Sequence, residues 1–163
     1  MIKLISHRAN LNGPCKEENE LSSIMNCLVN YNYDAEIDVH FIDGLLHIGH
    51  DLPSKFTLSV ISFVNTFTSY KDRLWIHCKN IEALSIFSKI DDNFNYFGHS
   101  DDEFVLTSRG YIFTRPNVIF EDAIVVMPEL ISNGTILNNH FKCKGILTDY
   151  PIKYETYYNT IRS

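Results

Sequence analysis

The sequence predicts an α/β fold, namely a compact, reduced (β/α)8 TIM-like barrel with several outer helices missing. Short apolar runs that suit strands alternate with segments of helical spacing, a pattern typical of a parallel sheet. Polar residues gather where these strands end, as at Ser6–Arg8, His77–Lys79 and Thr148–Asp149, and this rim carries the active sites of barrel folds. The 163 residues fit one domain but fall short of the roughly 250 of a typical barrel, so outer helices must be absent.

The N-terminal part of the chain contains strand patterns on either side of a helix pattern. Residues 2–6 form an apolar run that predicts a buried strand. A helix is expected over about 18–30, where apolar residues recur at helical spacing and acidic residues would occupy the positive end of the helix dipole. Residues 34–41 alternate as a strand does, and Asp43–Gly44 predicts a tight turn into a return strand at 45–48.

The remainder of the chain continues the strand pattern while its helix pattern weakens. Helices are expected at about 57–69, 81–90 and 152–161. Strands are expected at about 74–78, 93–97, 104–106, 111–114, 123–127 and 145–148. Little helical spacing occurs between the strands expected at 104–106, 111–114 and 123–127. We therefore expect the outer layer of helices to be incomplete there.

The charge balance excludes one class of partner. The formal net charge is −6 at pH 7, and an acidic surface repels the nucleic-acid backbone, so broad binding to DNA or RNA is not expected. A local pocket for one phosphate remains compatible with this balance, because a few Lys or Arg side chains set the field there. The expected partner is therefore a small molecule.

The cysteines and the hydropathy pattern indicate a cytoplasmic protein. Cys15, Cys27, Cys78 and Cys143 are far apart and form no C-x-x-C pair, which disfavours a zinc ribbon and a disulfide framework. No signal peptide and no apolar stretch of membrane-spanning length is evident. A basic amphipathic stretch that would dock on a bilayer is also lacking, so no stable membrane association is expected.

Two carboxylates and two histidines make a coherent chemical set. Glu36 and Asp38 lie two residues apart on one face of the strand at 34–41, where they can grip one hard cation through oxygen. His7 and His50 follow strands and titrate near neutrality, so one can accept a proton while the other donates one. A divalent cation would offset charge that builds on a phosphoryl group, so the set suits phosphodiester cleavage.

Several short motifs support this interpretation by their order along the chain. They are His7-Arg8, Glu18-Asn19, Glu36-Ile37-Asp38-Val39, Asp43-Gly44, His50-Asp51, Ile76-His77-Cys78-Lys79 and Gly145-Ile146-Leu147-Thr148-Asp149-Tyr150-Pro151. In this order they resemble the signature of glycerophosphodiester phosphodiesterases. The wider group includes the phosphatidylinositol-specific phospholipase C-like barrels and the spider-toxin phospholipases D.

The resemblance implies roles for individual residues. By it, His7 and His50 would be the general acid and base, and Glu36 and Asp38 would hold a divalent metal ion, Mg²⁺ or Ca²⁺. In the family, a hydroxyl of the substrate's own alcohol can attack phosphorus, so a cyclic phosphate can form before or instead of hydrolysis. Both end points, a hydrolase and a cyclising lyase, stay open here.

The third strand departs from the family pattern. Lys79, with Arg8 beside it, would contact the phosphate, but His77 stands where the family has an acidic third metal ligand. His77 is either a ligand or a hydrogen-bonded pocket residue. Because imidazole is a softer ligand than carboxylate, a softer metal or a site with two ligands becomes an alternative to Mg²⁺ or Ca²⁺.

Three further residues are candidates for the pocket. His99 follows a predicted strand, Arg109 offers a positive charge for a second anionic group, and Asp149 could reach the pocket mouth. For Asp149 there is a structural alternative, since the Tyr-Pro that follows it suits a turn equally well.

The leading hypothesis is a phosphodiesterase that cleaves a small glycerophosphodiester or a related glycan- or nucleotide-linked phosphodiester. Short chains of this kind resemble accessory enzymes of bacterial surface-glycan pathways. The rival hypothesis is a catalytically inactive barrel that binds phosphate or metal and lost activity with its third acidic ligand. The intact pair His7 and His50 favours the enzyme, because binding alone has no use for two proton-transfer groups.

Overall fold

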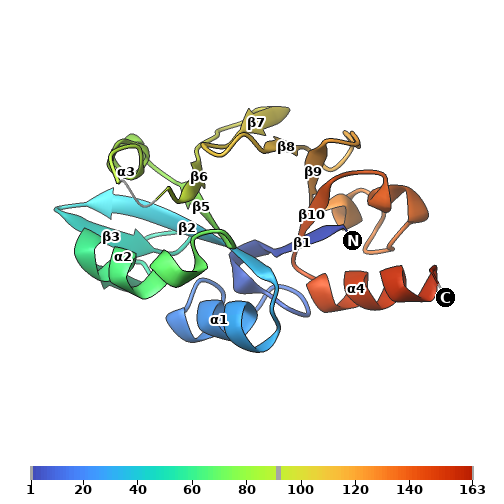
Figure 1. Ribbon diagram of the computed structural model, residues 1–163, viewed down its shortest axis with the longest axis horizontal. Coiled ribbons are helices and arrows are strands. Elements are labelled where there is room, and N and C mark those ends of the chain that lie inside the picture. The colour runs from blue at the N-terminus through green and yellow to red at the C-terminus, as the bar shows by residue number, and fades with distance from the viewer. Residues whose placement is uncertain (1, 91–92, 163) are drawn as a thin grey trace.

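The strands of the protein form one strongly curled sheet with helices along part of its outer side (Figure 1). The structure is a computed structural model, and it describes residues 2–90 and 93–162. The fold is therefore mixed α/β, as the alternation of strand and helix patterns predicts.

Parallel pairing connects most of the sheet. The parallel path runs β6 (Asn95–Phe97), β5 (Leu74–Cys78), β2 (Asp34–Ile42), β1 (Lys3–Ser6), β10 (Gly145–Thr148), β9 (Ala123–Val126) and β8 (Ile112–Thr114). β7 (Phe104–Leu106) pairs antiparallel with β8. β3 (Leu45–Ile48) pairs antiparallel with the far end of β2, and β4 (Phe56–Leu58) pairs antiparallel with β3.

The curled sheet has a seam between β6 and β7. Within the part of the chain that the structure describes, no strand ladder joins these two strands. They are linked instead through the β7–β8 turn, where Ser108 N donates to Tyr96 O at 2.8 Å and Tyr96 N donates to Ser108 Oγ at 2.9 Å. The sheet is thus a partial barrel.

The helices lie outside the sheet and cover it unevenly. They are α1 (Leu21–Met25), α2 (Val60–Phe67), α3 (Ile81–Phe87) and α4 (Pro151–Thr160), with a π-helical turn at Asn26–Asn30 and short 3₁₀ turns at His7–Ala9, Thr68–Tyr70, Pro128–Leu130 and Asn138–Phe141. Figure 1 places α1 and α4 on one side of the sheet, beneath β1. Residues 98–122 are all described and contain no helix. No helix therefore follows β7 or β8 directly, and this is the region where the sequence predicts an incomplete outer layer.

Alternation along the strands divides the hydrophobic core into an inner and an outer part. The inner cluster fills the barrel floor and consists of Ile5, Trp75, Phe97, Phe113, Ile124 and Leu147. The outer cluster lies between the sheet and the helices, where Ile37 and Val39 of β2 meet Phe63 of α2 and Leu28. Tyr154 of α4 is fully buried against Ile146 in a further cluster. Consecutive residues of one strand therefore serve opposite faces of the sheet.

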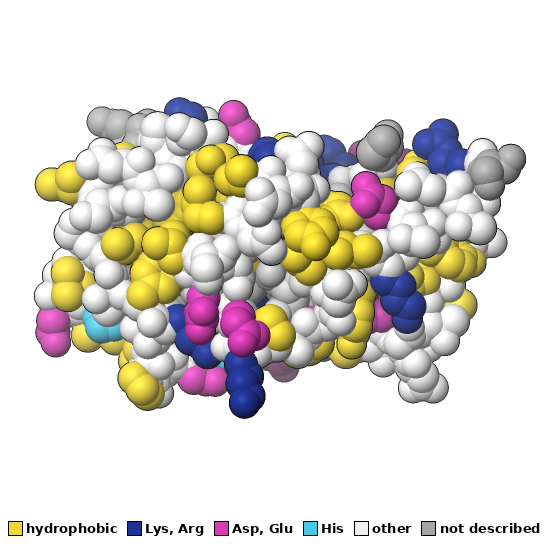
Figure 2. Space-filling view, turned by 90° about the horizontal axis from the view of Figure 1, so that it is seen from below, with side chains coloured by type: hydrophobic (Ala, Val, Ile, Leu, Met, Phe, Trp, Pro, Cys, Tyr) yellow, Lys and Arg dark blue, Asp and Glu magenta, His cyan; other side chains and the backbone are white. Residues whose placement is uncertain are grey.

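The face of the molecule that is seen from below Figure 1 mixes apolar, polar and charged side chains (Figure 2). Leu21, Val29 and Tyr31 are partly or largely exposed there. No helix among the described residues combines the length and apolar character needed to cross a bilayer.

The predicted helix over 18–30 begins later than expected. α1 starts at Leu21, and Glu20 is its N-cap, so no acidic residue lies in its first turn and the expected dipole interaction is wrong. The cause is Asn19, whose φ is 60° and whose side chain bonds to Asp38, because a residue in this conformation cannot continue a right-handed helix.

Several other elements differ from expectation. The helix predicted over 57–69 begins at Val60, after Ser59 caps it by accepting from Ser62 N, and residues 56–58 form β4 instead. Residues 56–58 form a strand because they pair with the edge of β3. The local sequence of 56–58 does not reveal this pairing. β7 and β8 are antiparallel because the short turn between them leaves no room for a parallel crossover.

Candidate functional site

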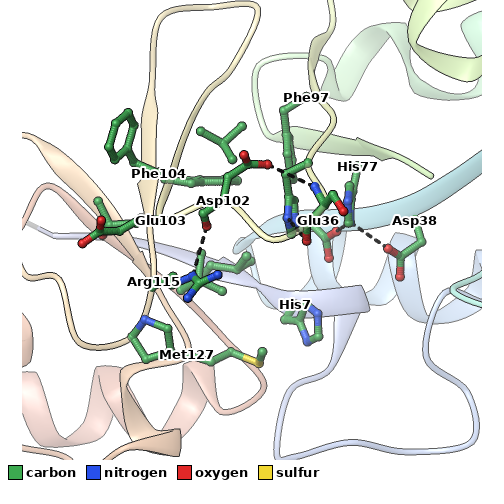
Figure 3. Close-up of a pocket in the computed structure, with 18 of the residues that line it drawn as sticks. His7, Glu36, Asp38, His77, Phe97, Asp102, Glu103, Phe104, Arg115 and Met127 are labelled. Carbon is green, nitrogen blue, oxygen red and sulfur yellow. Dashed lines mark hydrogen bonds and ion pairs between the residues drawn. The ribbon is translucent and has the colours of Figure 1, made fainter. Parts of the chain in front are cut away.

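A cavity of about 390 Å³ opens at the carboxyl ends of the parallel strands. Most of the residues singled out in the sequence line it: His7, Arg8, Glu36, Asp38, His50, His77, Lys79 and His99. Figure 3 shows Glu36, Asp38 and His77 on one side of this cavity and His7 near its middle. They converge because inward-facing residues of neighbouring parallel strands reach the same edge of the sheet.

Glu36, Asp38 and His77 form the closest group of potential metal ligands. One ligand atom from each lies within 4.8 Å of the others. His77 Nδ1 is 3.0 Å from Asp38 Oδ1 and 3.7 Å from Glu36 Oε1. The register explains this proximity, because Asp38 of β2 lies directly beside His77 of β5. The expectation that both carboxylates share one face of the strand is confirmed.

The Asp38 carboxylate also contacts two cationic side chains and one side-chain amide. Arg8 Nε lies 3.0 Å from Asp38 Oδ2, and Lys79 Nζ lies 3.7 Å from Asp38 Oδ1. Asn19 Nδ2 donates to Asp38 Oδ2 at 3.1 Å, while Asp38 N donates to Asn19 Oδ1 at 3.0 Å. Asn19 therefore fixes both the backbone and the carboxylate of Asp38. Sequence reasoning placed Asn19 inside a helix and assigned it no contact.

The turn after β1 brings Arg8 against the carboxylates. Arg8 and Ala9 have φ values of 52° and 60°, a left-handed conformation that L-residues rarely adopt. In this turn Arg8 N donates to Glu36 Oε2 at 3.0 Å, and Arg8 NH1 pairs with Glu18 at 3.2 Å. Strained backbone of this kind concentrates at functional sites, where surrounding contacts hold it.

Burial and neighbouring charges shift the pKa values of Glu36 and Asp38 in opposite directions. Burial, together with the charge of Asp38, raises the pKa of Glu36 to about 7. Burial also opposes ionisation of Asp38, but the hydrogen bond from His77 and the charges of His77, Arg8 and Lys79 outweigh it and hold its pKa below the usual range. Burial lowers the pKa of His77. Asp38 is thus the permanent anion of the group, whereas Glu36 can hold a proton near neutrality.

His7 lies on the cavity wall with a carboxylate behind it. Its Nδ1 is 2.8 Å from Asp149 Oδ1, which also accepts from Asn10 Nδ2 at 2.9 Å. Burial would lower the pKa of His7, but the Asp149 bond and the charges of Glu36 and Asp149 outweigh it and raise the pKa. Asp149 was expected at the pocket mouth and is not among the lining residues. It orients His7, leaving Nε2 free for a ligand.

His50 reaches the same cavity from the loop after β3. Its Nδ1 is 2.9 Å from Asp51 Oδ1, and its side chain is 37% exposed. His40 supports this loop, because its Nε2 is 3.1 Å from His50 O. Both His7 and His50 therefore bind a carboxylate through Nδ1 and keep Nε2 available.

The ring of His77 is held by stacking as well as by hydrogen bonding. It stacks on His99 at a centroid distance of 4.6 Å and on Phe97 at 5.0 Å, with interplanar angles of 8° and 7°. His99 is exposed, and its Nδ1 is 3.2 Å from Ser100 O. His99 lines the pocket as expected, and its ring stacks on those of His77 and Phe97.

Arg109 lies outside the cavity, so its expected place in the pocket is wrong. It pairs with Asp72 at 2.8 Å and donates to Lys71 O at 3.3 Å, near the start of β5. The reason is topological: the β7–β8 turn that carries Arg109 lies at the opposite end of the sheet, because β7 runs antiparallel.

Arg115 is the arginine that lines the cavity instead. It follows β8 at the end where the parallel strands finish, and it pairs with the Asp101 carboxylate and donates to the backbone oxygens of Asp101 and Asp102. The alternation Tyr111, Phe113, Arg115 was the signal that could have identified it, since it gives Arg115 the inward face.

The donor set fits a divalent cation. Two carboxylates and one imidazole nitrogen converge within 4.8 Å, and this mixture is compatible with hard cations and with first-row transition metals. The lowered pKa of Asp38 favours its ionised form, whereas the raised pKa of Glu36 opposes the ionisation that metal binding needs. Arg8 and Lys79 compete for the same charge, so a bound cation would have to displace part of these ion pairs.

Comparisons of the chain with protein-family models, with curated proteins and with solved structures gave no match.

Proposed function

We propose that this chain is a metal-dependent phosphodiesterase of the glycerophosphodiester phosphodiesterase type on a reduced TIM-like barrel. One observation carries the proposal: His7 and His50 line the same cavity as the group formed by Glu36, Asp38 and His77. Proton-transfer groups and cation ligands around one space are what phosphodiester cleavage requires.

Glu36, Asp38 and His77 are the residues that would hold the cation. A bound divalent ion supplies positive charge that stabilises a phosphoryl group as negative charge builds on its oxygens. Asn19 keeps Asp38 in place through two hydrogen bonds, and the stacked rings of Phe97 and His99 fix the plane of His77. The ligand side chains are therefore preorganised by their own neighbours.

The two histidines would carry the protons. One imidazole takes the proton of the attacking hydroxyl, which belongs to water or to the substrate's own alcohol, as the new P–O bond forms. The other gives a proton to the leaving alcohol oxygen as its P–O bond breaks, so the proton count balances. His7 uses Asp149 and His50 uses Asp51 to orient Nε2 toward the substrate.

Lys79 and Arg8 would bind the phosphate oxygens. Both cations line the cavity next to Asp38, so a diester anion held there would contact the positive charge of Lys79 and Arg8, and a bound divalent cation would add to that charge. The substrate class that fits is a small phosphodiester, either a glycerophosphodiester or a related glycan- or nucleotide-linked one.

A phosphodiester screen with ³¹P NMR product analysis tests the function. We expect turnover that EDTA abolishes and that Mg²⁺, Mn²⁺ or Ca²⁺ restores, and the product signal distinguishes a monoester from a cyclic phosphate. The matched control is the His7→Ala variant, which keeps the cation ligands and should lose turnover. A chain that binds metal and phosphate but converts no diester would contradict the proposal.

The alternative is a binding protein without catalysis. The observation that favours it is that Arg8 and Lys79 both form ion pairs with Asp38 and so compete with a metal ion for its charge. In that case the chain would bind inorganic phosphate or a divalent metal ion, and the diester screen would show none of the products.

A further inference from the structure

Asn10 is a buried polar residue close to the cavity residues that does not itself line the cavity. It is 1% exposed and directly follows the turn at His7–Ala9. Asn10 N donates to His7 O at 2.9 Å, and Ser6 Oγ donates to Asn10 O. Because buried polar groups need hydrogen-bond partners, the side chain of Asn10 must find its own partners at this fixed place.

The side-chain amide of Asn10 lies between two carboxylates. Its Nδ2 donates to Asp149 Oδ1 at 2.9 Å and to Glu18 Oε2 at 3.4 Å. Its Oδ1 accepts from the thiol of Cys15 at 3.3 Å. Because ionised carboxylates only accept hydrogen bonds, the two N–H groups of the amide are the atoms that suit this place.

Each of these carboxylates also holds a residue of the cavity wall. Asp149 Oδ1 lies 2.8 Å from His7 Nδ1, and Glu18 Oε1 lies 3.2 Å from Arg8 NH1. Asn10 bonds to the other oxygen of Glu18, so it does not compete with Arg8 for the same atom. A line of polar contacts therefore runs from His7 through Asp149, Asn10 and Glu18 to Arg8.

The segment that carries Asn10 and Glu18 is also fastened to the end of β10. Gly13 N donates to Asp149 O at 2.8 Å. Gly13 has a φ of 116°, and a Cβ there would lie 2.9 Å from Cε1 of Tyr150, so this close approach requires glycine. Asp149 is thus held by its backbone through Gly13 and by its carboxylate through Asn10.

We propose that Asn10 is a positioning residue whose single amide group fixes both the imidazole of His7 and the guanidinium of Arg8. The proposal rests on the proposed function for what these two residues do, which is proton transfer and phosphate binding. Among the described residues, the hydrogen bonds to the Asp149 carboxylate come from His7 and Asn10. Without Asn10, only His7 itself would hold the carboxylate that orients it.

The protonation site of the neutral His7 ring tests this arrangement. It is measured by ¹⁵N NMR of the full chain at a pH above the titration of His7. In the native protein the proton should lie on Nδ1, which faces Asp149. In Asn10→Ala a form with the proton on Nε2 should appear, because the carboxylate is no longer held against Nδ1. A His7 ring that keeps its proton on Nδ1 in Asn10→Ala would overturn the proposal.

Two controls accompany this measurement. Asn12→Ala is the matched variant, because Asn12 lies in the same segment and is exposed, and it should leave the proton of His7 on Nδ1. The ring of His50 is an internal control, because its Nδ1 bonds to Asp51 and not to Asp149. An equal change at His50, or the same change in Asn12→Ala, would contradict the assignment to Asn10.

The native chain gives a second measurement that does not depend on whether Asn10→Ala folds. The Asn10 side-chain amide should exchange with deuterium at least about tenfold more slowly than the exposed amide of Asn12, because its N–H groups are hydrogen-bonded and buried. Equal exchange rates would mean that the two hydrogen bonds do not persist in solution, and the proposal would fail.

Binding of inorganic phosphate tests the contact with Arg8. In isothermal titration, Asn10→Ala should bind phosphate about five- to tenfold more weakly than the native chain, a factor that corresponds to one lost hydrogen bond. The reason is that Glu18 would no longer be fixed and would hold Arg8 less firmly. Asn12→Ala should bind like the native chain. Equal or tighter binding by Asn10→Ala, or no binding by the native chain, would contradict the proposal.

Neither measurement needs turnover, so the inference and the proposed function can fail separately. If the His7 ring and the phosphate affinity change as expected but ³¹P NMR detects no cleavage of any diester, the positioning role stands and the phosphodiesterase does not. If diesters are cleaved while Asn10→Ala changes neither measurement, the phosphodiesterase stands and the role of Asn10 is wrong.

Discussion

At the scale of single residues, the two histidines of the cavity differ in how firmly they are held. The His7 side chain is 15% exposed and its partner Asp149 is 11% exposed, whereas Asp51, the partner of His50, is 88% exposed. A hydrogen bond between buried groups is harder to replace by water than one at the surface. The orientation of His7 is therefore fixed by the fold, and that of His50 is set more by its loop.

Replacing the histidines tests their roles as an acid–base pair. Each of His7→Ala and His50→Ala should lower the turnover rate by roughly 10²–10⁴, the usual contribution of a general acid or base. The double variant should lose little more than the worse single variant, because groups that act as a unit are strongly non-additive. Steady-state kinetics measures the rates. Metal affinity, measured by titration, should be retained in all three variants, and its loss would mean that the histidines act as ligands.

Asp149→Asn tests the ion pair through its pH dependence. The pKa of His7 is raised above 6.5, so its share of the stability is complete below pH 6.5 and is lost as the pH rises through the folded-state pKa. Burial opposes ionisation of Asp149, but its bond with His7 outweighs this and lowers its pKa below 3.8. Its share is therefore present above pH 3.8 and is lost as the pH falls through the folded-state pKa.

Asp149→Asn should thus destabilise the protein most between pH 3.8 and pH 6.5, by about 1–3 kcal/mol. Urea unfolding at several pH values measures this. Asp51→Asn removes the exposed partner of His50 and serves as the control, with an expected change near zero. A destabilisation by Asp149→Asn that stays constant from pH 4 to pH 9 would exclude the ion pair as its cause.

At the scale of elements, β2 organises the site. It pairs with β1 at its start, with β5 along its middle and with β3 at its end. Asn80 fastens this end to α3: its Oδ1 accepts from Phe41 N and from Ala83 N, and its Nδ2 donates to Phe41 O. One side chain therefore caps a helix and completes the hydrogen bonding of a strand.

Asn80→Ala should accordingly cost more than an ordinary helix cap. Loss of a cap costs about 0.5–2 kcal/mol, and the variant also leaves the backbone groups of Phe41 without partners, which adds about 1 kcal/mol or more. Ser59→Ala is the control, because Ser59 caps α2 through Ser62 N without bonding to a strand. Denaturant unfolding compares the two, and equal losses would show that the strand contacts contribute nothing.

At the scale of the whole molecule, the residues that we propose as cation ligands, Glu36, Asp38 and His77, lie on the neighbouring strands β2 and β5, so metal binding should stabilise the entire fold. A ligand that binds only the native state adds about 2.7 kcal/mol at a concentration of 100 times its Kd. Thermal unfolding with Mn²⁺ and with EDTA measures this as a rise in Tm. Glu36→Gln should abolish the rise, while Glu121→Gln, at an exposed position outside the ligand group, should keep it. A rise that persists in Glu36→Gln would place the metal elsewhere.

The sequence pattern predicted the parts of the molecule that local periodicity controls. The strands at 45–48, 74–78 and 145–148 have the predicted bounds, and the alternation in β2 brought Glu36 and Asp38 to one face. Local periodicity could not predict which strands pair. β4, for example, forms because it pairs with the edge of β3. Arg109 was assigned to the wrong end of the sheet for the same reason, since the antiparallel direction of β7 is a property of the pairing.

The seam between β6 and β7 has a consequence for amide hydrogen exchange. Hydrogen bonds through Tyr96 and Ser108 replace a ladder there, so opening this side requires breaking far fewer bonds than parting β2 from β5. Deuterium should therefore enter the amides of β6 and β7 faster than those of β2 under native conditions. Because His99, Ser100 and Asp102–Val105 line the cavity, these openings would also loosen one wall of the cavity.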